Sequence, residues 1–183
     1  MIIFLIIVSI VVLQRIAEVI YARVNEKRMK RSGAVEIGRS HYKWIVLLHV
    51  SFFVSLIAEV MCKGVNMGSV WPLLFFIFLA SQALRIWTLA SLGKYWNTKI
   101  IVLPGEKRVK RGPYRFLSHP NYLIVAVELL IIPLLFGAWV TAVVFSLLNA
   151  LLLLFIRIPA EEEALRQLRN AEKEKSPRMS VEK

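Results

Sequence analysis

Two clusters of polar residues in this sequence hold the side chains best suited to chemistry. Residues 114–122 include Tyr114 and His119, and residues 157–163 include Arg157 and a run of three glutamates. Arginine can bind an anion through two parallel hydrogen bonds, glutamate can accept hydrogen bonds from hydroxyl groups, and histidine can act as a general base. Two long apolar runs separate the clusters. If these runs cross a membrane and return, both clusters reach the same membrane face and form one polar site.

The composition indicates an integral membrane protein. Of the 183 residues, 57% are hydrophobic, and the mean hydropathy is +0.61, which is too high for an ordinary soluble domain. A helix needs about 20 apolar residues to cross the hydrocarbon core. We expect membrane spans at residues 1–24, 41–62, 70–92, 120–136 and 139–156. The predicted fold is all-α, with five transmembrane helices, a cytoplasmic loop over 93–118 and a C-terminal surface helix over 159–173.

This fold is expected to form a single membrane domain over residues 1–183. Residues 1–92 would supply three N-terminal transmembrane helices, residues 93–175 a catalytic core with the other two, and residues 176–183 a tail. Within the loop, Thr98–Leu103 is a short β-like run ended by Pro104-Gly105. Such a long loop is typical of a functional segment. Residues 25–40 read as a basic loop.

The charge pattern sets the expected orientation and excludes several functions. The net charge is +12, and the Lys and Arg residues are concentrated in three blocks, near residues 23–43, 94–115 and 157–183. Basic segments stay on the cytoplasmic side, so the N-terminus is expected outside and the C-terminus in the cytoplasm. No stacking platform or groove-entering helix favours nucleic acid as a partner. A single cysteine, three scattered histidines and the lack of any aspartate argue against a metal site.

Charged residues also occur inside the predicted spans. Arg15 and Glu18 are three residues apart in the first span, so they can pair on one helix face. Two interpretations remain open, an interhelical ion pair and a role in substrate binding, and the first is favoured. The two polar clusters likewise have a structural interpretation as helix caps and helix ends. Their coexistence at one membrane face favours a functional site.

The residue pattern around both clusters resembles a known enzyme family. Gly-Pro-Tyr-Arg-x3-His-Pro-Asn-Tyr at 112–122, followed after the hydrophobic hairpin by Arg-x3-Glu-Glu-Glu at 157–163, is similar to the isoprenylcysteine carboxyl methyltransferase family, and most to its small bacterial members. The resemblance covers roughly the half of the chain from Leu92 onward. It implies an integral-membrane methyltransferase that uses S-adenosylmethionine without a soluble Rossmann domain. No Gly-x-Gly-x-x-Gly motif follows a predicted strand.

The resemblance also implies roles for individual residues. The cofactor would be bound by Tyr114, His119, Pro120, Asn121, Tyr122, Glu161 and Glu162, with backbone contacts from Glu106, Lys107, Arg108 and Val109. Arg157 would position the substrate. The chain departs from the family pattern at two places, Ser118 and Glu106, where the family often has arginine and histidine. These departures bear on the polar rim of the site and therefore on the substrate.

The expected reaction moves a methyl group to an oxygen, a carboxylate or an acidic hydroxyl, of a lipophilic small-molecule or lipidated substrate within membrane lipid. Transfer from a sulfonium cation to an anion destroys both charges, and a dry site favours that loss. A carboxylate needs no general base, whereas an amine or hydroxyl would need one, and His119 is the nearby candidate. Three alternatives remain: phospholipid amine N-methylation, an NADPH-dependent membrane enone or sterol reductase, and a non-catalytic protein that binds anionic lipid.

Overall fold

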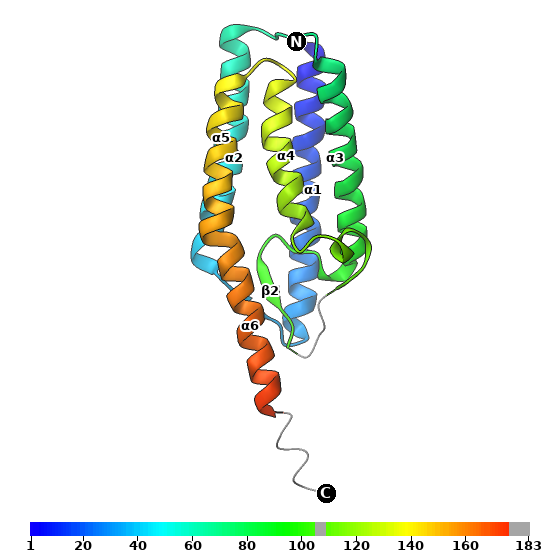
Figure 1. The fold of residues 1–183 in the computed structure, drawn as a ribbon, viewed down its shortest axis with the longest axis vertical. Helices are drawn as coiled ribbons and strands as arrows, with labels where there is room; N and C mark the ends of the chain where they lie inside the picture. Colours follow the sequence, from blue (N-terminus) through cyan, green and yellow to red (C-terminus); the bar gives the residue numbers. More distant parts are fainter. Residues whose placement is uncertain (105–108, 176–183) are drawn as a thin grey trace, which may run out of the picture.

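The protein is a bundle of antiparallel helices with loops and short extended segments at one end (Figure 1). This is called the polar end, because it carries the polar residues 114–119 and 157–163. The computed structural model describes the backbone of residues 1–104 and 109–175, and the side chains of these residues except 39–41 and 167–175. The bundle helices in this part are α1 (Ile2–Arg31), α2 (Arg39–Lys63), α3 (Trp71–Leu92), α4 (Pro120–Leu134) and α5 (Trp139–Leu152). Because the chain reverses after each helix, the segment between α3 and α4 lies at the same end as the continuation of α5.

Four helices in the described residues are long and apolar enough to cross a membrane. They are Ile2–Arg31, Tyr42–Lys63, Trp71–Tyr95 and Trp139–Arg166. The fifth predicted span corresponds to α4, which has 15 residues and is therefore about 22 Å long, against roughly 30 Å of hydrocarbon. The helix ends just after Pro133, and Gly137 turns the chain with φ of 77°. The prediction of five full-length spans is therefore not confirmed, because α4 is short.

The interior position of α4 explains how a short helix fits the bundle. It packs against α3 and α5, and the side chains of Ile124, Leu129 and Ile132 are almost completely buried. Across the bundle, Phe4 of α1 contacts Phe136 edge-to-face at 5.0 Å between ring centroids. These contacts form a continuous apolar core that holds the first residues of α4 at the polar end of the bundle.

Residues 25–40 differ from the predicted basic loop. Helix α1 continues to Arg31, and the basic side chains of Arg28, Lys30 and Arg31 in its last turn complement the helix dipole. A short strand then follows, β1 (Val35–Ile37), which pairs antiparallel with β2 (Ile100–Val102). The predicted β-like run at 98–103 is thus confirmed as β2, but the sequence did not predict its partner.

The C-terminal helix also differs from the prediction. A separate surface helix was expected from Pro159, but α5 runs without a break through a π-helical turn (Leu153–Arg157) into α6 (Ile158–Lys175). The wider turn accommodates Pro159, which cannot donate the usual backbone hydrogen bond. Arg157 and Glu161 therefore lie on one continuous helix, four residues apart and on the same face.

A buried network of charges joins α1, α3 and α4. Arg85, which is 1% exposed, donates hydrogen bonds to Glu128 at 2.9 and 2.5 Å and pairs with Glu18 at 3.2 Å. Arg15 pairs with Glu18 at 2.8 Å and also contacts Glu128. Gln82 donates a hydrogen bond of 2.7 Å to Glu128. Two arginines and two glutamates balance in charge, so the interhelical interpretation of Arg15 and Glu18 is confirmed and extended.

Candidate active site

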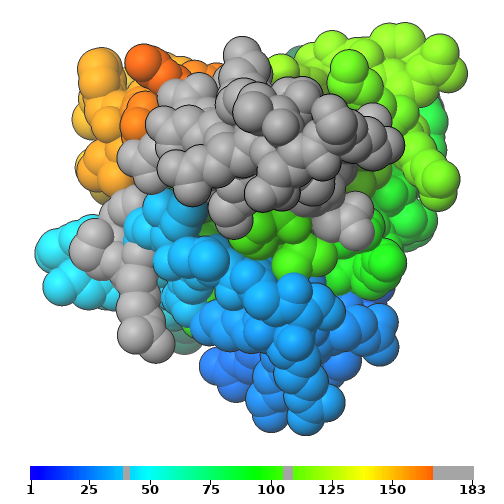
Figure 2. All heavy atoms as spheres, turned by 90° about the horizontal axis from the view of Figure 1, so that it is seen from below, coloured from blue at the N-terminus to red at the C-terminus, as the bar shows by residue number. Residues whose placement is uncertain are grey.

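The polar end of the bundle opens into a cavity of about 520 Å³, which is large enough for a small-molecule ligand. Seen from this end, parts of α1, α2, α6 and the segment between α3 and α4 all reach the same face (Figure 2). The cavity walls come from helices α1 to α6, from residues 95–103, and from Val109, Tyr114, Ser118 and His119. The cavity extends from the polar end into the apolar part of the bundle, where Val12, Ile45 and Phe53 line it.

Tyr122 links the two polar clusters. Its hydroxyl donates a hydrogen bond to Glu161 and accepts one of 3.0 Å from Nε of Arg157. Tyr122 is on the first turn of α4, whereas Arg157 and Glu161 lie around the junction of the π turn and α6. The predicted fold-back between the clusters is confirmed, because residues 35 and 39 positions apart in sequence are bonded to one hydroxyl group.

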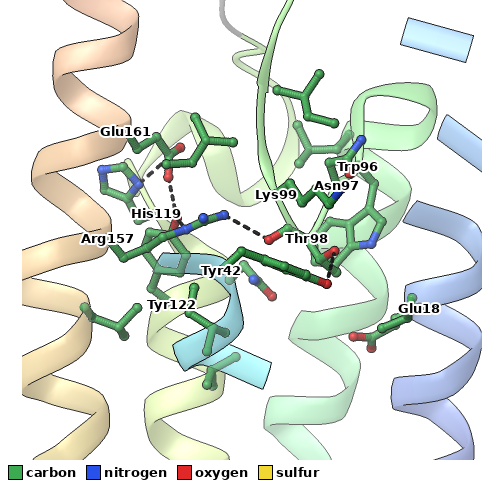
Figure 3. A pocket seen from close by; sticks show the side chains of 18 of the residues that line it. Glu18, Tyr42, Trp96, Asn97, Thr98, Lys99, His119, Tyr122, Arg157 and Glu161 are labelled. Atoms are coloured by element: carbon green, nitrogen blue, oxygen red, sulfur yellow. Dashed lines mark hydrogen bonds and ion pairs between the residues drawn. The ribbon is translucent and has the colours of Figure 1, made fainter. Parts of the chain in front are cut away.

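His119 occupies the wall beside this bond. Its ring stacks on the Tyr122 ring with 5.3 Å between centroids, and its Nδ1 lies 3.7 Å from Glu161 (Figure 3). Nε2 lies 3.7 Å from Glu162, whose side chain is 65% exposed. His119 is the N-cap residue of α4 but makes no side-chain cap hydrogen bond, and Pro120 follows at the start of the helix. The position fits the predicted wall residue.

The opposite wall comes from the segment around β2. The Nη2 of Arg157 donates a hydrogen bond of 2.9 Å to the carbonyl of Thr98, and the Thr98 hydroxyl lies 3.2 Å from that of Tyr42 on α2. Figure 3 shows Arg157 reaching across the cavity from the π turn toward Thr98 and Tyr42. Arg157 is 4% exposed, so its charge is held inside the protein by these partners.

A cluster of ion pairs fixes β2 and therefore this wall. Lys99 pairs with Glu26 at 2.9 Å and with Glu36 of β1 at 3.2 Å, and Lys30 pairs with Glu36 at 2.5 Å. The hydrogen bond to Glu26 raises the pKa of Lys99 above its usual value. The hydrogen bond from Lys30 lowers the pKa of Glu36 below its usual value. Both shifts favour the charged forms, so the ion pairs that hold β2 in place stay ionised at neutral pH.

Several polar atoms at this end of the cavity are buried without a hydrogen-bond partner in the described part of the protein. They are Nη1 of Arg157, Nε2 of His119, Oδ1 of Asn121, Nε1 of Trp96 and Oδ1 of Asn97. All five residues line the cavity. Buried polar groups are normally hydrogen-bonded, so such a concentration around one cavity favours a polar ligand there.

The structure brings together most of the residues that the sequence predicted for the site. Val109, Tyr114, His119, Asn121, Tyr122, Arg157 and Glu161 all line the cavity. Pro120 is buried at the start of α4, and Glu162 lies at the exposed rim. Glu106, Lys107 and Arg108 lie outside the described residues. Their predicted contacts with a cofactor remain predictions.

Sequence reasoning missed other residues of the cavity. Thr98 was predicted only as part of a strand and Tyr42 was not assigned to the site, yet both contribute to the wall opposite Arg157. Further into the bundle, His49 and Asn149 line the cavity from α2 and α5. A usable signal for these two was present, because histidine and asparagine are uncommon in apolar membrane helices and often mark function there.

Comparison with known proteins agrees with this geometry. The model of a protein family described as isoprenylcysteine carboxyl methyltransferase (ICMT) matches residues 72–167, which are more than half of the chain and include both polar clusters. The chain belongs to this family. Membership in the ICMT family confirms the predicted resemblance and indicates an integral-membrane methyltransferase. It does not favour the alternatives of lipid amine methylation or NADPH-dependent reduction.

Two relatives are similar to this ICMT-family chain over most of its length. The uncharacterized protein YpbQ of Bacillus subtilis (strain 168) is 48% identical over 164 residues, which make up 90% of this chain and 97% of the relative. An uncharacterized protein of Haemophilus influenzae (strain ATCC 51907 / DSM 11121 / KW20 / Rd) is 28% identical over 145 residues, or 79% and 84% of the two chains. No solved structure matches the chain significantly.

Proposed function

We propose that this protein transfers a methyl group from S-adenosylmethionine to an oxygen of a lipophilic acceptor. The observation that carries the proposal is the joint anchoring of Arg157 and Glu161 on the Tyr122 hydroxyl, at the polar end of a cavity whose other end is apolar. An arginine suits an anionic acceptor, and a glutamate suits a cationic, hydroxyl-bearing donor. The apolar part of the cavity suits a hydrocarbon chain.

The polar end fits S-adenosylmethionine in its residue types. Glu161 would accept hydrogen bonds from ribose hydroxyls or attract the positive charge, and the aromatic rings of Tyr114, His119 and Tyr122 would pack against the flat or cationic parts. The unpartnered Nε2 of His119 and Oδ1 of Asn121 offer further polar contacts. When bound, S-adenosylmethionine supplies a methyl group on a positively charged sulfur. The residues around it would serve to bind, orient and exclude water.

Arg157 would position the acceptor. Its Nε and Nη2 are fixed by Tyr122 and Thr98, whereas Nη1 has no partner among the described residues, so one donor remains to hold an oxygen anion. A carboxylate reaches the site already deprotonated, so no residue need take up its proton. The buried setting of Arg157 strengthens its attraction for the anion. His119 would then act as a wall residue.

The charge pattern supports a cytoplasmic location for this site. The basic segments cluster at the end of the bundle that carries β1, β2 and α6, while Lys63 is the last residue of α2 at the other end. By the positive-inside rule the polar end, the C-terminus and the cofactor site would face the cytoplasm. Cytoplasmic S-adenosylmethionine and a membrane-dissolved acceptor would then reach the cavity from different sides.

A binding comparison and a transfer experiment test the proposal together. Purified protein in lipid nanodiscs is titrated with S-adenosylmethionine and, separately, with NADPH, and we expect binding of the first alone. Membranes that contain the protein are then incubated with methyl-labelled S-adenosylmethionine, and the labelled lipid fraction is treated with mild base. Label released as methanol from a methyl ester, or base-stable label on an ether oxygen, supports O-methylation. Label that stays on a base-stable amine, or binding of NADPH instead, would overturn the proposal.

A further inference from the structure

The membrane-embedded part of the cavity contains polar side chains that the proposed transfer does not use. His49 of α2 and Asn149 of α5 both line it, within helices whose sequences are otherwise mostly apolar. Asn149 is only 3% exposed. Polar groups in membrane helices usually bond across a helix interface, and those that do not are expensive to keep. These two side chains therefore call for a ligand or a structural partner.

The packing register places the two residues at the same level. Helices α2 and α5 are antiparallel neighbours in which Ser55 meets Thr141 at 2.9 Å between hydroxyl oxygens, and Phe52 meets Phe145 at 5.6 Å between ring centroids. One further helical turn toward the polar end brings His49 opposite Asn149. The tight packing of Phe52 on Phe145 closes the interface just beyond them. The pair thus forms the floor of the polar part of the cavity, and the apolar side chains of Val12 and Phe53 line the part beyond it.

Both side chains keep free hydrogen-bonding capacity. Nδ1 of His49 lies 2.8 Å from the carbonyl oxygen of Ile45. A carbonyl only accepts, so Nδ1 carries the hydrogen, and Nε2 of the neutral ring is left as an acceptor. The Asn149 side chain makes no hydrogen bond to any described residue, although its amide offers both a donor and an acceptor. In contrast, the nearby Ser55 and Thr141 bond to each other.

We propose that this His49–Asn149 floor binds a hydroxyl group of the acceptor, distinct from the oxygen that receives the methyl group. A hydroxyl is the group that satisfies both residues at once, because it can donate to Nε2 of His49 and accept from the Asn149 amide. The inference rests on the proposed function, since it takes Arg157 as the site that holds the methyl-accepting oxygen. Asn149 precedes Arg157 by eight residues, so the two polar groups of the acceptor would be separated by about 12 Å along α5.

The charges near the floor favour a neutral group there. Arg15 and Arg85 act on His49 electrostatically, as does Glu128. These charges are already balanced within the buried network of Arg15, Glu18, Arg85 and Glu128. A second charged group on the acceptor would disturb that balance, whereas a hydroxyl adds hydrogen bonds without adding charge. The acceptor is therefore an amphiphile with one acidic oxygen and one neutral hydroxyl on its chain.

A hydroxyl scan tests the assignment. The probes are unbranched long-chain carboxylic acids of one length, either unsubstituted or with a single hydroxyl group moved one carbon at a time. The full-length protein in nanodiscs is assayed for methyl ester formation and, independently of turnover, for thermal stabilisation by each acid. We expect one narrow optimum of hydroxyl position, with about a tenfold preference over the unsubstituted acid. A flat profile in both measurements would overturn the assignment.

Substitutions at Asn149 test whether the preference for hydroxyl position comes from the His49–Asn149 floor. In Asn149→Leu, the ratio between the best hydroxy acid and the unsubstituted acid should fall to about one, and Asn149→Ser should restore part of it. Replacing an unpaired buried amide by leucine should not lower the melting temperature of the ligand-free protein. The control is Val144→Leu on the lipid-facing side of α5, which should keep the preference. A preference that survives in Asn149→Leu would refute the assignment.

The two measurements separate this inference from the proposed function. Acids that are methylated without any preference for hydroxyl position would leave the transfer reaction standing and remove the floor site. A position-dependent thermal stabilisation without methyl ester formation would do the reverse: the floor site would stand, and the carboxylate methyl transfer would fail.

Discussion

The Nε of Arg157 donates a hydrogen bond of 3.0 Å to the hydroxyl of Tyr122, which joins the last turn before α6 to the first turn of α4. The same hydroxyl donates to Glu161, so a single group orients the residue assigned to the acceptor and the residue assigned to the donor. This arrangement couples the two halves of the proposed site. It also makes Tyr122 the position where one small change should affect both.

Removing the Tyr122 hydroxyl should impair acceptor and cofactor together. We expect Tyr122→Phe to lower kcat/KM roughly 10- to 100-fold, because bonds to two charged partners are lost while the ring still stacks on His119. Steady-state kinetics with both substrates varied would measure this. In the double variant Tyr122→Phe, Arg157→Lys, the loss of transition-state stabilisation should be smaller than the sum of the losses in the two single variants. Full additivity would show that the bond between Tyr122 and Arg157 plays no part in transfer.

Glu161 should contribute chiefly to cofactor affinity. Glu161→Gln keeps the shape but removes the charge, so we expect S-adenosylmethionine to bind roughly 10-fold more weakly, with normal membrane insertion. Isothermal titration in nanodiscs gives the affinity. Glu162→Gln is the matched comparison, because the Glu162 side chain is 65% exposed and should matter less. Wild-type affinity in Glu161→Gln would remove Glu161 from the site.

Arg157 should contribute chiefly to acceptor turnover. Lysine keeps the charge of Arg157 but cannot reproduce the fork that contacts Tyr122 and Thr98 while leaving a third donor free. In Arg157→Lys we expect kcat/KM for the acceptor to fall about 100-fold or more, with cofactor affinity changed by less than about threefold. Parallel binding and turnover measurements make the comparison. A collapse of cofactor affinity would reassign Arg157.

The buried charge network should be sensitive to the loss of one member. Glu128 is 3% exposed and balances Arg85 and Arg15, so Glu128→Gln leaves uncompensated positive charge inside the bundle. We expect a loss of about 3–5 kcal/mol in the free energy of unfolding, measured by denaturant titration in mixed micelles. Lys63→Gln breaks an ion pair whose lysine is 56% exposed, and it should cost under about 1 kcal/mol. Equal losses would contradict the buried-network interpretation.

Gly112 should be required for the close approach of residues 112–115 to α3. A Cβ at this position would lie 2.0 Å from Oγ of Ser91 and 3.0 Å from Nε1 of Trp87, with φ at 54°. Gly93 has a similar φ of 50° but nothing within 4 Å, so Gly93→Ala measures backbone strain without an overlap, about 1–3 kcal/mol. Gly112→Ala should destabilise more, by the cost of the overlap. Equal melting temperatures for the two variants would show that the contact is dispensable.

The sequence alone determined the helices, and most of the residues that it proposed for the site line the cavity. Apolar runs predicted where each helix begins within about two residues, although α1 continues to Arg31 rather than ending near residue 24. The β-branched run at 98–103 predicted β2, because both signals depend on local physics. The spacing of His119-Pro120-Asn121-Tyr122 and Arg157 to Glu161 indicated the family. The prediction that both clusters meet at one end followed from counting the crossings between them.

Only the tertiary structure decided which atoms meet. The pairing of β1 with β2, the burial of Glu128 beside Arg85, and the approach of Thr98 to Arg157 join residues far apart in the sequence, and no local pattern encodes such contacts. The continuous helix through Arg157 also escaped prediction, because a proline normally ends a helix unless a π turn makes room for it. His49 and Asn149 became a candidate site only when the structure placed both along one cavity, since no local pattern relates residues so far apart in the sequence.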